Sequence, residues 1–373
     1  MKNVVILGGG FAGLRAALVL KNKVKSHNLH ITLIDKHSFH VFTPSLYEVA
    51  TAEEPQLNVV IPYGVIFNKN IEVVRGNVGN IDISKKTIFI DSADGKERGQ
   101  EFEYDYLIYA LGSHTQDFGI PGIREYGVGL KTLEDAVKIK NALSEIIMTG
   151  KNKVVVGGGG FSGTELACEI AAHQPRLDVT MIQGSPILLK ELGDGFSELA
   201  KKRLEEGNVR VILGVHIKKV NSKTVVIDGD KEVPYDLLVW TGGVGSDKLL
   251  GDIEVNNFLQ VKGHENIFAA GDTISPGVAP RAEKMGRVAA ENVLKSIKGN
   301  NLLPYSYRHL GYIVPLGSHF AALAMGKFHI SGVLAFFVQQ IVFFLYLLRI
   351  VPPLEALKRF RKFEKTLNED WLS

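Results

Sequence analysis

The sequence of 373 residues contains a single cysteine, Cys168. One cysteine cannot form an intramolecular disulfide, so enzymes that need a redox-active cysteine pair are excluded. Cys168 lies within a small apolar helical pattern after residue 163, which favours a packed apolar side chain over a nucleophile.

Metal-binding patterns are also scarce. His37 and His40 are three residues apart, but their loop-like stretch offers no set of cysteine or carboxylate partners. We therefore expect surface or packing histidines, and we predict no metal site.

Charge of one sign is not in excess, because the formal net charge is only +3. A nucleic-acid partner is therefore not expected.

A predicted strand starts at Asn3 and leaves no room for a secretory signal, so we expect a cytoplasmic protein. Hydrophobic residues make up 45% of the chain, which is ample for the buried cores of two or three domains.

What the chain does contain is the same glycine cluster twice. Residues 8–13 read GGGFAG and residues 158–163 read GGGFSG. Each cluster follows a run of β-branched residues and precedes a small apolar helical pattern, which predicts a strand, a tight turn and a helix. Such a turn lets the backbone approach a pyrophosphate, whose charge faces the helix N-terminus.

Two copies in this context predict two bound dinucleotides. The predicted contacts of the first copy come from Gly8, Gly10, Phe11, Ala12 and Gly13. Those of the second copy come from Gly158, Gly160, Phe161 and Gly163.

The residue that ends the following strand differs between the copies. In the first copy it is Asp35, about 20 residues beyond the last glycine, where a carboxylate accepts hydrogen bonds from ribose hydroxyls. In the second copy it is Gln183, which is uncharged and does not repel a 2′-phosphate. We predict that the second site accepts NADPH as well as NADH. The alternative is that Gln183 points elsewhere and a later residue contacts the ribose.

Two other segments resemble parts of flavoproteins that hold two dinucleotides. Residues 266–272 are a short apolar strand running into Gly271-Asp272, a pattern that closes the FAD site in those proteins, with the aspartate bound to the ribityl chain. Residues 106–113 resemble their Ala-x-Gly turn beside FAD, which places Ala110 and Gly112 there. The order of these segments along the chain implies that the FAD-binding half comes first, that the NAD(P)-binding half is inserted into it, and that the chain then completes the FAD-binding half.

The predicted fold class is therefore α/β, with two Rossmann-like dinucleotide-binding domains and a C-terminal helical, membrane-associating region. We expect a discontinuous FAD-binding domain over residues 1–115 and 255–310. The NAD(P)H-binding domain is expected over residues 116–254, and the membrane-associating region over residues 311–373.

The C-terminal tail has a different composition from the rest. Residues 330–348 contain no charged side chain and are long enough to just span a bilayer. Pro352-Pro353 stops the helix, and a second pattern up to Trp371 has apolar residues on one half of a helical wheel and lysines and arginines on the other. We expect two helices, at about 330–350 and about 354–370.

Three arrangements of this tail are open. In the first, both helices lie on one leaflet or dip into it. In the second, residues 330–348 span the bilayer. In the third, the apolar helix is buried in an interface between subunits or between domains. We favour the first, a monotopic protein at the cytoplasmic face, because spanning exports the basic run and places Gln339 and Gln340 near mid-span. The third keeps a homodimer as an alternative.

With these residues in hand, the chain resembles the type II NADH dehydrogenases, single-subunit NADH:quinone oxidoreductases of the membrane surface. Residues 40–51, HVFTPSLYEVAT, are similar to the family's loop between the FAD strand and the flavin ring, apart from Ser45, where the family usually has leucine. Further matches lie at residues 120–122, 130–132, 135–136, 240–243 and 311–317. The resemblance covers nearly the whole chain.

The resemblance implies further site residues. For FAD these are Lys36, Thr43, Pro44 and Val78, and for NAD(P)H the residue is Gly242. Glu165 is the family's candidate for contacting the nicotinamide end; the alternative is a first-turn carboxylate favoured by the helix dipole. Glu283, with Lys284, stands on the quinone side, near a position where the family usually has glutamine.

The implied activity passes hydride from NADH or NADPH to non-covalently bound FAD, and two electrons on to a membrane quinone of a respiratory chain. No set of buried charges resembling a proton path is recognised, so no proton pumping is expected. Two other functions remain open: a reductase of a protein acceptor, and a non-catalytic FAD-binding protein that responds to NAD(P)H.

Overall fold

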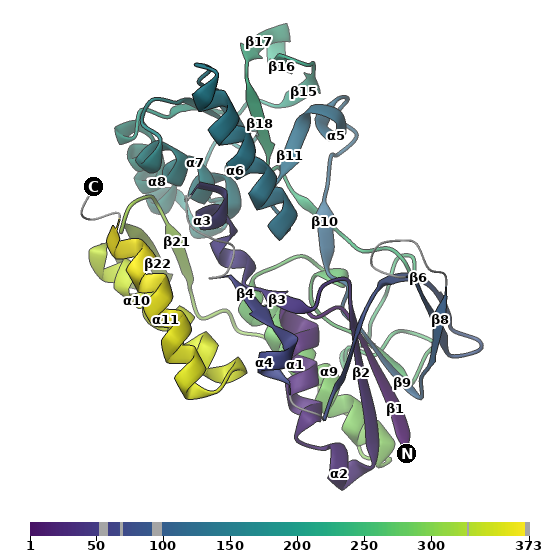
Figure 1. Cartoon of the computed structure of the whole chain (residues 1–373). Helices are drawn as coiled ribbons and strands as arrows, with labels where there is room; N and C mark the ends of the chain where they lie inside the picture. The colour runs from purple at the N-terminus through teal and green to yellow at the C-terminus, as the bar shows by residue number, and fades with distance from the viewer. Residues whose placement is uncertain (52–58, 68–69, 92–98, 327, 370–373) are drawn as a thin grey trace. The chain divides into compact units, whose positions relative to one another are not determined.

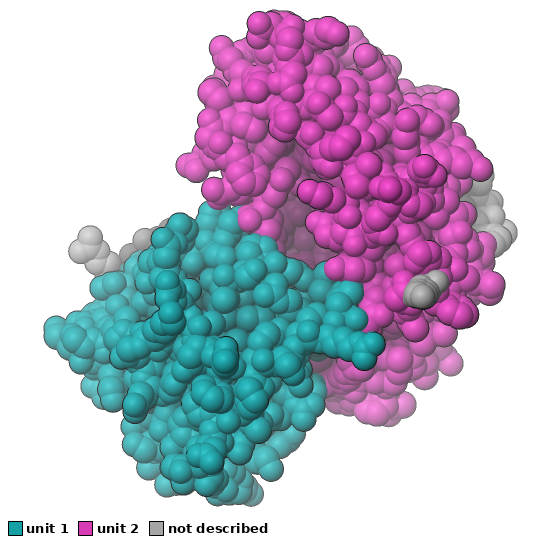
Figure 2. Space-filling view, turned by 180° about the vertical axis from the view of Figure 1, so that it is seen from behind, with its two compact units in different colours: residues 1–41, 60–114, 245–309 teal, residues 42–59, 115–244, 310–373 magenta. Residues whose placement is uncertain are grey.

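The computed structural model describes residues 1–51, 59–67, 70–91, 99–326 and 328–369 (Figure 1), with side chains up to residue 361. Trp371 of the interfacial pattern lies outside the described residues. The chain divides into two compact units (Figure 2), residues 1–41, 60–114 and 245–309, and residues 42–59, 115–244 and 310–373. The domain boundaries expected from the sequence stay a prediction.

The first unit is built on a five-stranded parallel sheet of order β20-β9-β1-β2-β5. Its strands are β20 (Ile267–Ala269), β9 (Tyr106–Tyr109), β1 (Lys2–Leu7), β2 (Leu29–Asp35) and β5 (Glu72–Arg75). The central strands are apolar and buried, as expected for a parallel sheet covered on both faces. Helices α1 (Phe11–Lys21) and α9 (Ala279–Ile297) pack against each other in this unit.

Smaller elements complete the first unit. A three-stranded antiparallel sheet covers part of its apolar core. Its strands are β6 (Asn77–Asp82), β7 (Thr87–Asp91) and β8 (Gln100–Glu103). The others are β3 (Phe39–Val41), β4 (Val60–Pro62), α2 (Val24–His27), α4 (Tyr63–Ile66) and η4 (Gly271–Thr273).

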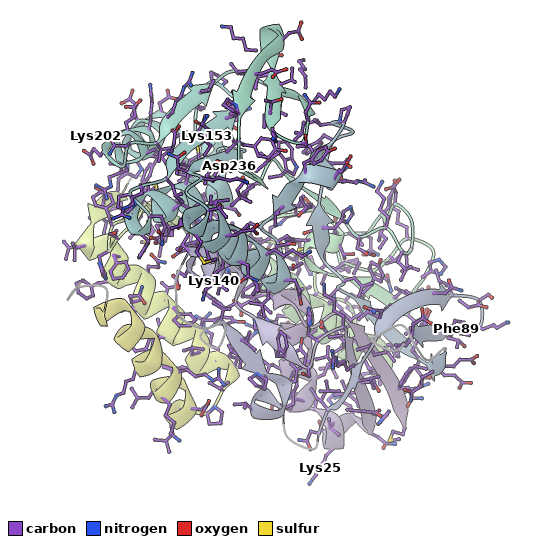
Figure 3. All side chains as sticks on the ribbon, turned by 45° about the horizontal axis from the view of Figure 1, so that its top comes forward. Lys25, Phe89, Lys140, Lys153, Lys202 and Asp236 are labelled. Atoms are coloured by element: carbon purple, nitrogen blue, oxygen red, sulfur yellow. The ribbon has the colours of Figure 1, made fainter. Side chains whose placement is uncertain are left out.

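The second unit repeats the parallel sheet, in the order β11-β18-β12-β13-β14. Its strands are β11 (Gly127–Gly129), β18 (Leu237–Trp240), β12 (Lys153–Gly157), β13 (Asp178–Gln183) and β14 (Arg210–Leu213). The start of β12 is tied to the residue before β18, because the backbone N–H of Lys153 donates to the Asp236 carboxylate at 3.0 Å (Figure 3). The longer helices of this part are α6 (Leu133–Met148), α7 (Phe161–His173) and α8 (Asp194–Glu206).

Beside this sheet the second unit carries an antiparallel sheet, and residues of both sheets form one apolar core. Its strands are β15 (Ile217–Val220), β16 (Thr224–Ile227) and β17 (Lys231–Pro234). The short elements of the unit are η1 (Thr43–Ser45), α3 (Leu46–Thr51), α5 (Ile123–Tyr126), η2 (Lys190–Leu192) and η3 (Asp228–Asp230). The chain passes between the units along β10 (Ser113–Thr115) and β19 (Val244–Ser246).

The C-terminal part of the second unit combines a sheet and two helices (Figure 1, yellow). The strands β21 (Tyr312–Pro315), β22 (Ala321–Met325) and β23 (Phe328–Gly332) are antiparallel. Helix α10 (Val333–Ile350) begins at Val333, because residues 328–332 pair with β22. It packs on α11 (Pro353–Glu369), with the Phe344 and Phe360 rings 4.9 Å apart.

Helix α10 is long and apolar enough to cross a membrane, judged by length and composition. Each of the two parallel sheets contains one strand, β1 or β12, that leads through a glycine turn into a helix. Together with α10, this confirms the predicted α/β class with a C-terminal apolar helix.

Candidate functional site

The first glycine turn lies between β1 and α1. Gly8 has φ +88°, and a Cβ atom added there would stand 2.3 Å from the carbonyl oxygen of Ala110. A Cβ atom at Gly13 would stand 1.8 Å from the carbonyl oxygen of Gly8. Only glycine therefore permits this approach of the turn to β9 and of the helix to the turn.

The second turn, between β12 and α7, has the same construction. Gly158 has φ +111°, and a Cβ atom at Gly163 would stand 1.9 Å from the carbonyl oxygen of Gly158. The N–H of Gly8 donates to the carbonyl of Ile34, and the N–H of Gly158 donates to the carbonyl of Ile182, each at 2.8 Å. The two turns are therefore equivalent in hydrogen bonding as well as in sequence.

Both turns end at a helix N-terminus suited to a pyrophosphate. In the described structure no side chain caps α1 after Gly10 or α7 after Gly160, and a Cβ atom at either glycine would meet open space. The first-turn N–H groups are thus available to an anion that the helix dipole also favours. The residues at both turns fit a dinucleotide.

The two positions predicted to contact a ribose, Asp35 and Gln183, also correspond in the structure. The Asp35 carboxylate at the end of β2 accepts from the N–H of Gly9 at 2.6 Å and from the N–H of His37 at 2.7 Å. The Gln183 side-chain oxygen at the end of β13 accepts from the N–H of Gly159 at 2.9 Å. The structure thus directs Gln183 to its own glycine turn, in the place that Asp35 has in the first copy.

Four further predicted FAD residues of the first unit, Ala110, Gly112, Gly271 and Asp272, lie near its turn. The Asp272 carboxylate accepts from the Ser113 hydroxyl at 2.8 Å and from the N–H of Gly277 at 3.1 Å. Gly271 approaches Ala12 so closely that a Cβ atom on the glycine would stand 2.9 Å from that of Ala12. Gly112 follows Ala110 with φ +84°.

A buried histidine supports the first turn. The His40 Nδ1 atom lies 2.9 Å from the carbonyl oxygen of Gly9, and its ring meets Phe11 edge to face at 5.1 Å. Burial lowers the pKa of His40 to about 4, so the ring is neutral at neutral pH and donates one N–H to Gly9. His40, expected from the sequence to be a surface or packing histidine, packs on the glycine turn.

Several predicted residues lie apart from the turns. Lys36 follows Asp35, and its carbonyl accepts from Arg75. Val78 is half-buried on β6, packed on the first unit's core. Thr43 and Pro44 are exposed on η1 in the second unit, whereas Glu283 is half-buried and Lys284 exposed on α9 in the first. By contrast, Phe161 and Gly242 lie at the second turn. Phe161 begins α7 and stacks on Tyr312 at 5.3 Å, and a Cβ atom added at Gly158 would stand 2.8 Å from the backbone nitrogen of Gly242.

Three carboxyl groups gather in the second unit. Glu48 comes from α3, and Glu165 and Glu169 come from α7. Burial, followed by the charge of Glu48 and then of Glu169, raises the pKa of Glu165 to about 8. Burial, with a contribution from Glu169, also raises the pKa of Glu48 to about 8. At neutral pH these two side chains are therefore mostly protonated.

This acidic cluster (Glu48, Glu165 and Glu169) is linked by hydrogen bonds to the apolar helix α10. The Tyr47 hydroxyl donates to Glu48 at 2.7 Å and accepts from the Gln339 side-chain amide at 3.1 Å. The Gln339 side-chain oxygen is buried without a hydrogen-bond partner among the described residues. His173 Nδ1 lies 3.2 Å from a Glu169 carboxylate oxygen.

Glu165 was predicted as a site residue, but its grouping with Glu48 and Glu169 was not predicted from the sequence. Two features of the sequence point to this cluster. Glu165 and Glu169 have the i, i+4 spacing of one helix face, and Gln339 interrupts an otherwise apolar helix.

The lone cysteine is placed in the core. Cys168 is 5% exposed on α7, and burial raises the pKa of its thiol. Among the described residues no group of three or more histidine, cysteine, aspartate or glutamate side chains is arranged to hold a metal ion.

Comparisons with known proteins agree with this geometry. The demethylphylloquinone reductase of Synechocystis sp. is 28% identical over 369 residues, which cover 91% of each chain. A type II NADH:quinone oxidoreductase of Mycobacterium tuberculosis is 28% identical over 92% of this chain and 83% of its own length. The structure of NDH2 from Plasmodium falciparum in complex with NADH has the same fold, with a TM-score of 0.85 at 17% identity, covering 97% of this chain and 98% of that one.

The family model of the pyridine nucleotide-disulphide oxidoreductases matches residues 2–286, which include both glycine turns and the Gly271-Asp272 segment. The chain belongs to the pyridine nucleotide-disulphide oxidoreductase family, although its single cysteine cannot supply that family's disulfide.

Proposed function

We propose that the chain is a type II NADH dehydrogenase, an NAD(P)H:quinone oxidoreductase that does not pump protons. It passes hydride from NADH or NADPH to FAD and two electrons on to a membrane quinone. The observation that carries this function is the pair of equivalent turns, Gly8–Gly13 and Gly158–Gly163, in a chain without a cysteine pair. FAD supplies the hydride-accepting and electron-donating chemistry when bound.

The roles of individual residues follow from their contacts. We propose that the first turn, Asp35 and Asp272 hold FAD, and that the second turn and Gln183 hold NAD(P)H. We keep the domain boundaries proposed from the sequence, with the FAD-binding domain at 1–115 and 255–310, the NAD(P)H-binding domain at 116–254 and the membrane-associating region at 311–373.

Protonated carboxyl groups suit this reaction, because a quinol carries protons as well as electrons. We propose that Glu165 contacts the nicotinamide end, where its neutral carboxyl can donate a hydrogen bond that a carboxylate cannot. Glu48, protonated and bound by Tyr47, holds a second exchangeable proton in the same cluster. We place Glu283 and Lys284 on the quinone side as proposed from the sequence.

The test is steady-state oxidation of NADH by the flavin-loaded protein in lipid vesicles, with a short-chain quinone as acceptor. We expect turnover that depends on the quinone. A flavin-loaded sample that oxidises no NADH refutes the proposal. Turnover only with a protein acceptor favours the alternative reductase, and slow reduction with no turnover with any acceptor favours the non-catalytic alternative.

We further propose that α10 lies on or in one leaflet, at the cytoplasmic face. Most of its exposed side chains are large and apolar, and the charged Arg349 lies in its last turn; the apolar ones are Val333, Leu334, Phe337, Ile341, Val342, Leu345 and Leu348. Leu354 and Leu357 at the start of α11 are also exposed. Such an apolar surface is unfavourable in water and is expected to lie against lipid or against a second copy of the chain.

Substitutions that introduce charge into this apolar surface test whether it contacts lipid. The Phe337 side chain is 57% exposed and the Ile341 side chain 56% exposed. We expect the double variant Phe337→Asp, Ile341→Asp to bind vesicles at least about tenfold more weakly. The reason is that a carboxylate at membrane depth costs about 2.5–3.5 kcal/mol. Vesicle co-sedimentation measures the effect. Met148→Asp, on an 80% exposed apolar residue of α6, is the matched control. If the double variant sediments with vesicles as the unsubstituted chain does, but is a monomer where the unsubstituted chain is a dimer, the apolar surface is a homodimer interface and not a lipid contact.

The nucleotide preference depends on Gln183. We expect Gln183→Glu to raise the KM for NADPH by at least about tenfold, or roughly 1.4 kcal/mol, because the carboxylate repels the 2′-phosphate. Parallel steady-state assays with NADH and NADPH measure the effect. Unchanged NADPH turnover in this variant removes Gln183 from the specificity argument.

A further inference from the structure

A histidine covers the backbone beside Gln183. A Cβ atom added at Gly184 would stand 2.8 Å from Cδ2 and 3.0 Å from Nε2 of His216. The loop after β14 is held there by two backbone bonds, from the N–H of Val215 to the carbonyl of Gln183 at 3.1 Å and from the N–H of Gly214 to the carbonyl of Ser185 at 3.0 Å. These backbone hydrogen bonds therefore place the His216 ring next to Gln183, the residue proposed to contact the ribose.

An aspartate orients this ring. One Asp228 oxygen accepts from the backbone N–H of His216 at 2.7 Å and lies 3.1 Å from the ring Nδ1. Its other oxygen lies 3.1 Å from Nζ of Lys218. These hydrogen bonds, first from the His216 backbone and then from Lys218, lower the pKa of Asp228 to about 2. A charged Asp228 accepts Nδ1–H, which leaves Nε2 on the side of Gly184.

The orientation of Gln183 supplies a second donor. The N–H of Gly159 can only donate, so the Gln183 atom that faces it is the carbonyl oxygen. The side-chain NH₂ group is then left as a donor. Residues 183–190, QGSPILLK, contain no carboxylate and end in Lys190. The His216 side chain is 66% exposed and accessible to a ligand.

We propose that His216 is a specificity-determining residue that binds the 2′-phosphate of NADPH through Nε2, beside the Gln183 amide. The inference rests on the proposed NAD(P)H site and names a ligand class for it, adenine nucleotides with a 2′-phosphate. In this arrangement Nε2–H donates to the phosphate while Asp228 accepts Nδ1–H. The negative charge of Asp228 is shared with Lys218, so the site as a whole does not repel an anion.

The test measures binding without catalysis. Adenosine 2′,5′-bisphosphate and adenosine 5′-monophosphate are titrated calorimetrically into the flavin-loaded full chain. We expect the bisphosphate to bind more tightly than the monophosphate, and His216→Ala to reduce the ratio of the two affinities by about tenfold, as for the loss of one charge-assisted hydrogen bond. His216→Lys, which keeps a cation there, is expected to retain most of the ratio.

A matched control is Lys219→Ala, which removes an exposed cation from β15, the strand that follows His216, but has no contact with residues 183–185 among the described interactions. An equal ratio in His216→Ala and in the unsubstituted chain overturns the proposal, as does an equal fall in Lys219→Ala. If neither nucleotide binds while NADH still reduces the flavin, the assignment of Gln183 and His216 fails and the oxidoreductase function stands. If NADH also fails to bind, the NAD(P)H site itself is wrong.

Discussion

Gly13→Val is expected to lose FAD, whereas Gly163→Val is expected to keep FAD and lose its response to NADH. A side chain at either position strikes backbone, 1.8 Å from the oxygen of Gly8 or 1.9 Å from that of Gly158. Overpacking against backbone costs at least about 1–3 kcal/mol, so we expect cofactor affinity to fall at least about tenfold. Flavin absorbance of the purified variants and nucleotide titration measure the two losses separately.

Glycines in open space provide the controls. A Cβ atom at Gly64 on α4 or at Gly195 on α8 meets no atom within 4 Å, and neither residue has a positive φ. Gly64→Ala and Gly195→Ala are expected to bind both cofactors as the unsubstituted chain does. Loss of both cofactors from each valine variant, at unchanged helical content, would contradict the division of the two dinucleotides between the two turns.

Glu48→Gln is expected to abolish much of the chain's loss of stability as the pH rises from about 4.5 to about 8. The pKa of Glu48 is about 8 in the folded protein, against an ordinary value of 4.5. Its contribution to stability is therefore complete below the ordinary pKa and decreases as the pH rises to the folded value, because the folded state then retains a proton that the unfolded state has lost. Glutamine stays neutral and still accepts from Tyr47.

The size of this effect follows from the shift. One buried carboxyl with such a pKa contributes on the order of 3–5 kcal/mol between about pH 5 and about pH 9. Urea unfolding of the flavin-loaded protein across this range measures it. Glu232→Gln, on an exposed residue of β17, serves as the control. Parallel stability curves for the unsubstituted chain and Glu48→Gln would show that Glu48 is ionised in the folded state.

Features built from neighbouring residues were predictable from the sequence. The turns at residues 8–13 and 158–163 depend on glycines close in the chain, because φ and the approach of Gly13 to Gly8 are local properties. The strand ends at Asp35 and Gln183 follow from the regular spacing of the strand–turn–helix unit. The fold class and the cofactor class could therefore be read from short segments.

Features that join distant segments could not be predicted in this way. The bond between Gln339 and Tyr47 links residues far apart in the chain, and neither residue shows its partner by type or spacing. The placement of His216 over Gly184 depends on the register of β13 with β14. The exposure of α10 was easier to anticipate, because a continuous apolar run is itself a local signal.

The central claim is that reducing equivalents pass from a pyridine nucleotide, through FAD, to a quinone. Stopped-flow spectroscopy of the vesicle-bound protein tests it by mixing first with NADH and then with a short-chain quinone. We predict that NADH bleaches the flavin absorbance and that the quinone restores it, with one quinol formed for each NADH consumed. Flavin that NADH reduces but no quinone reoxidises would contradict the account.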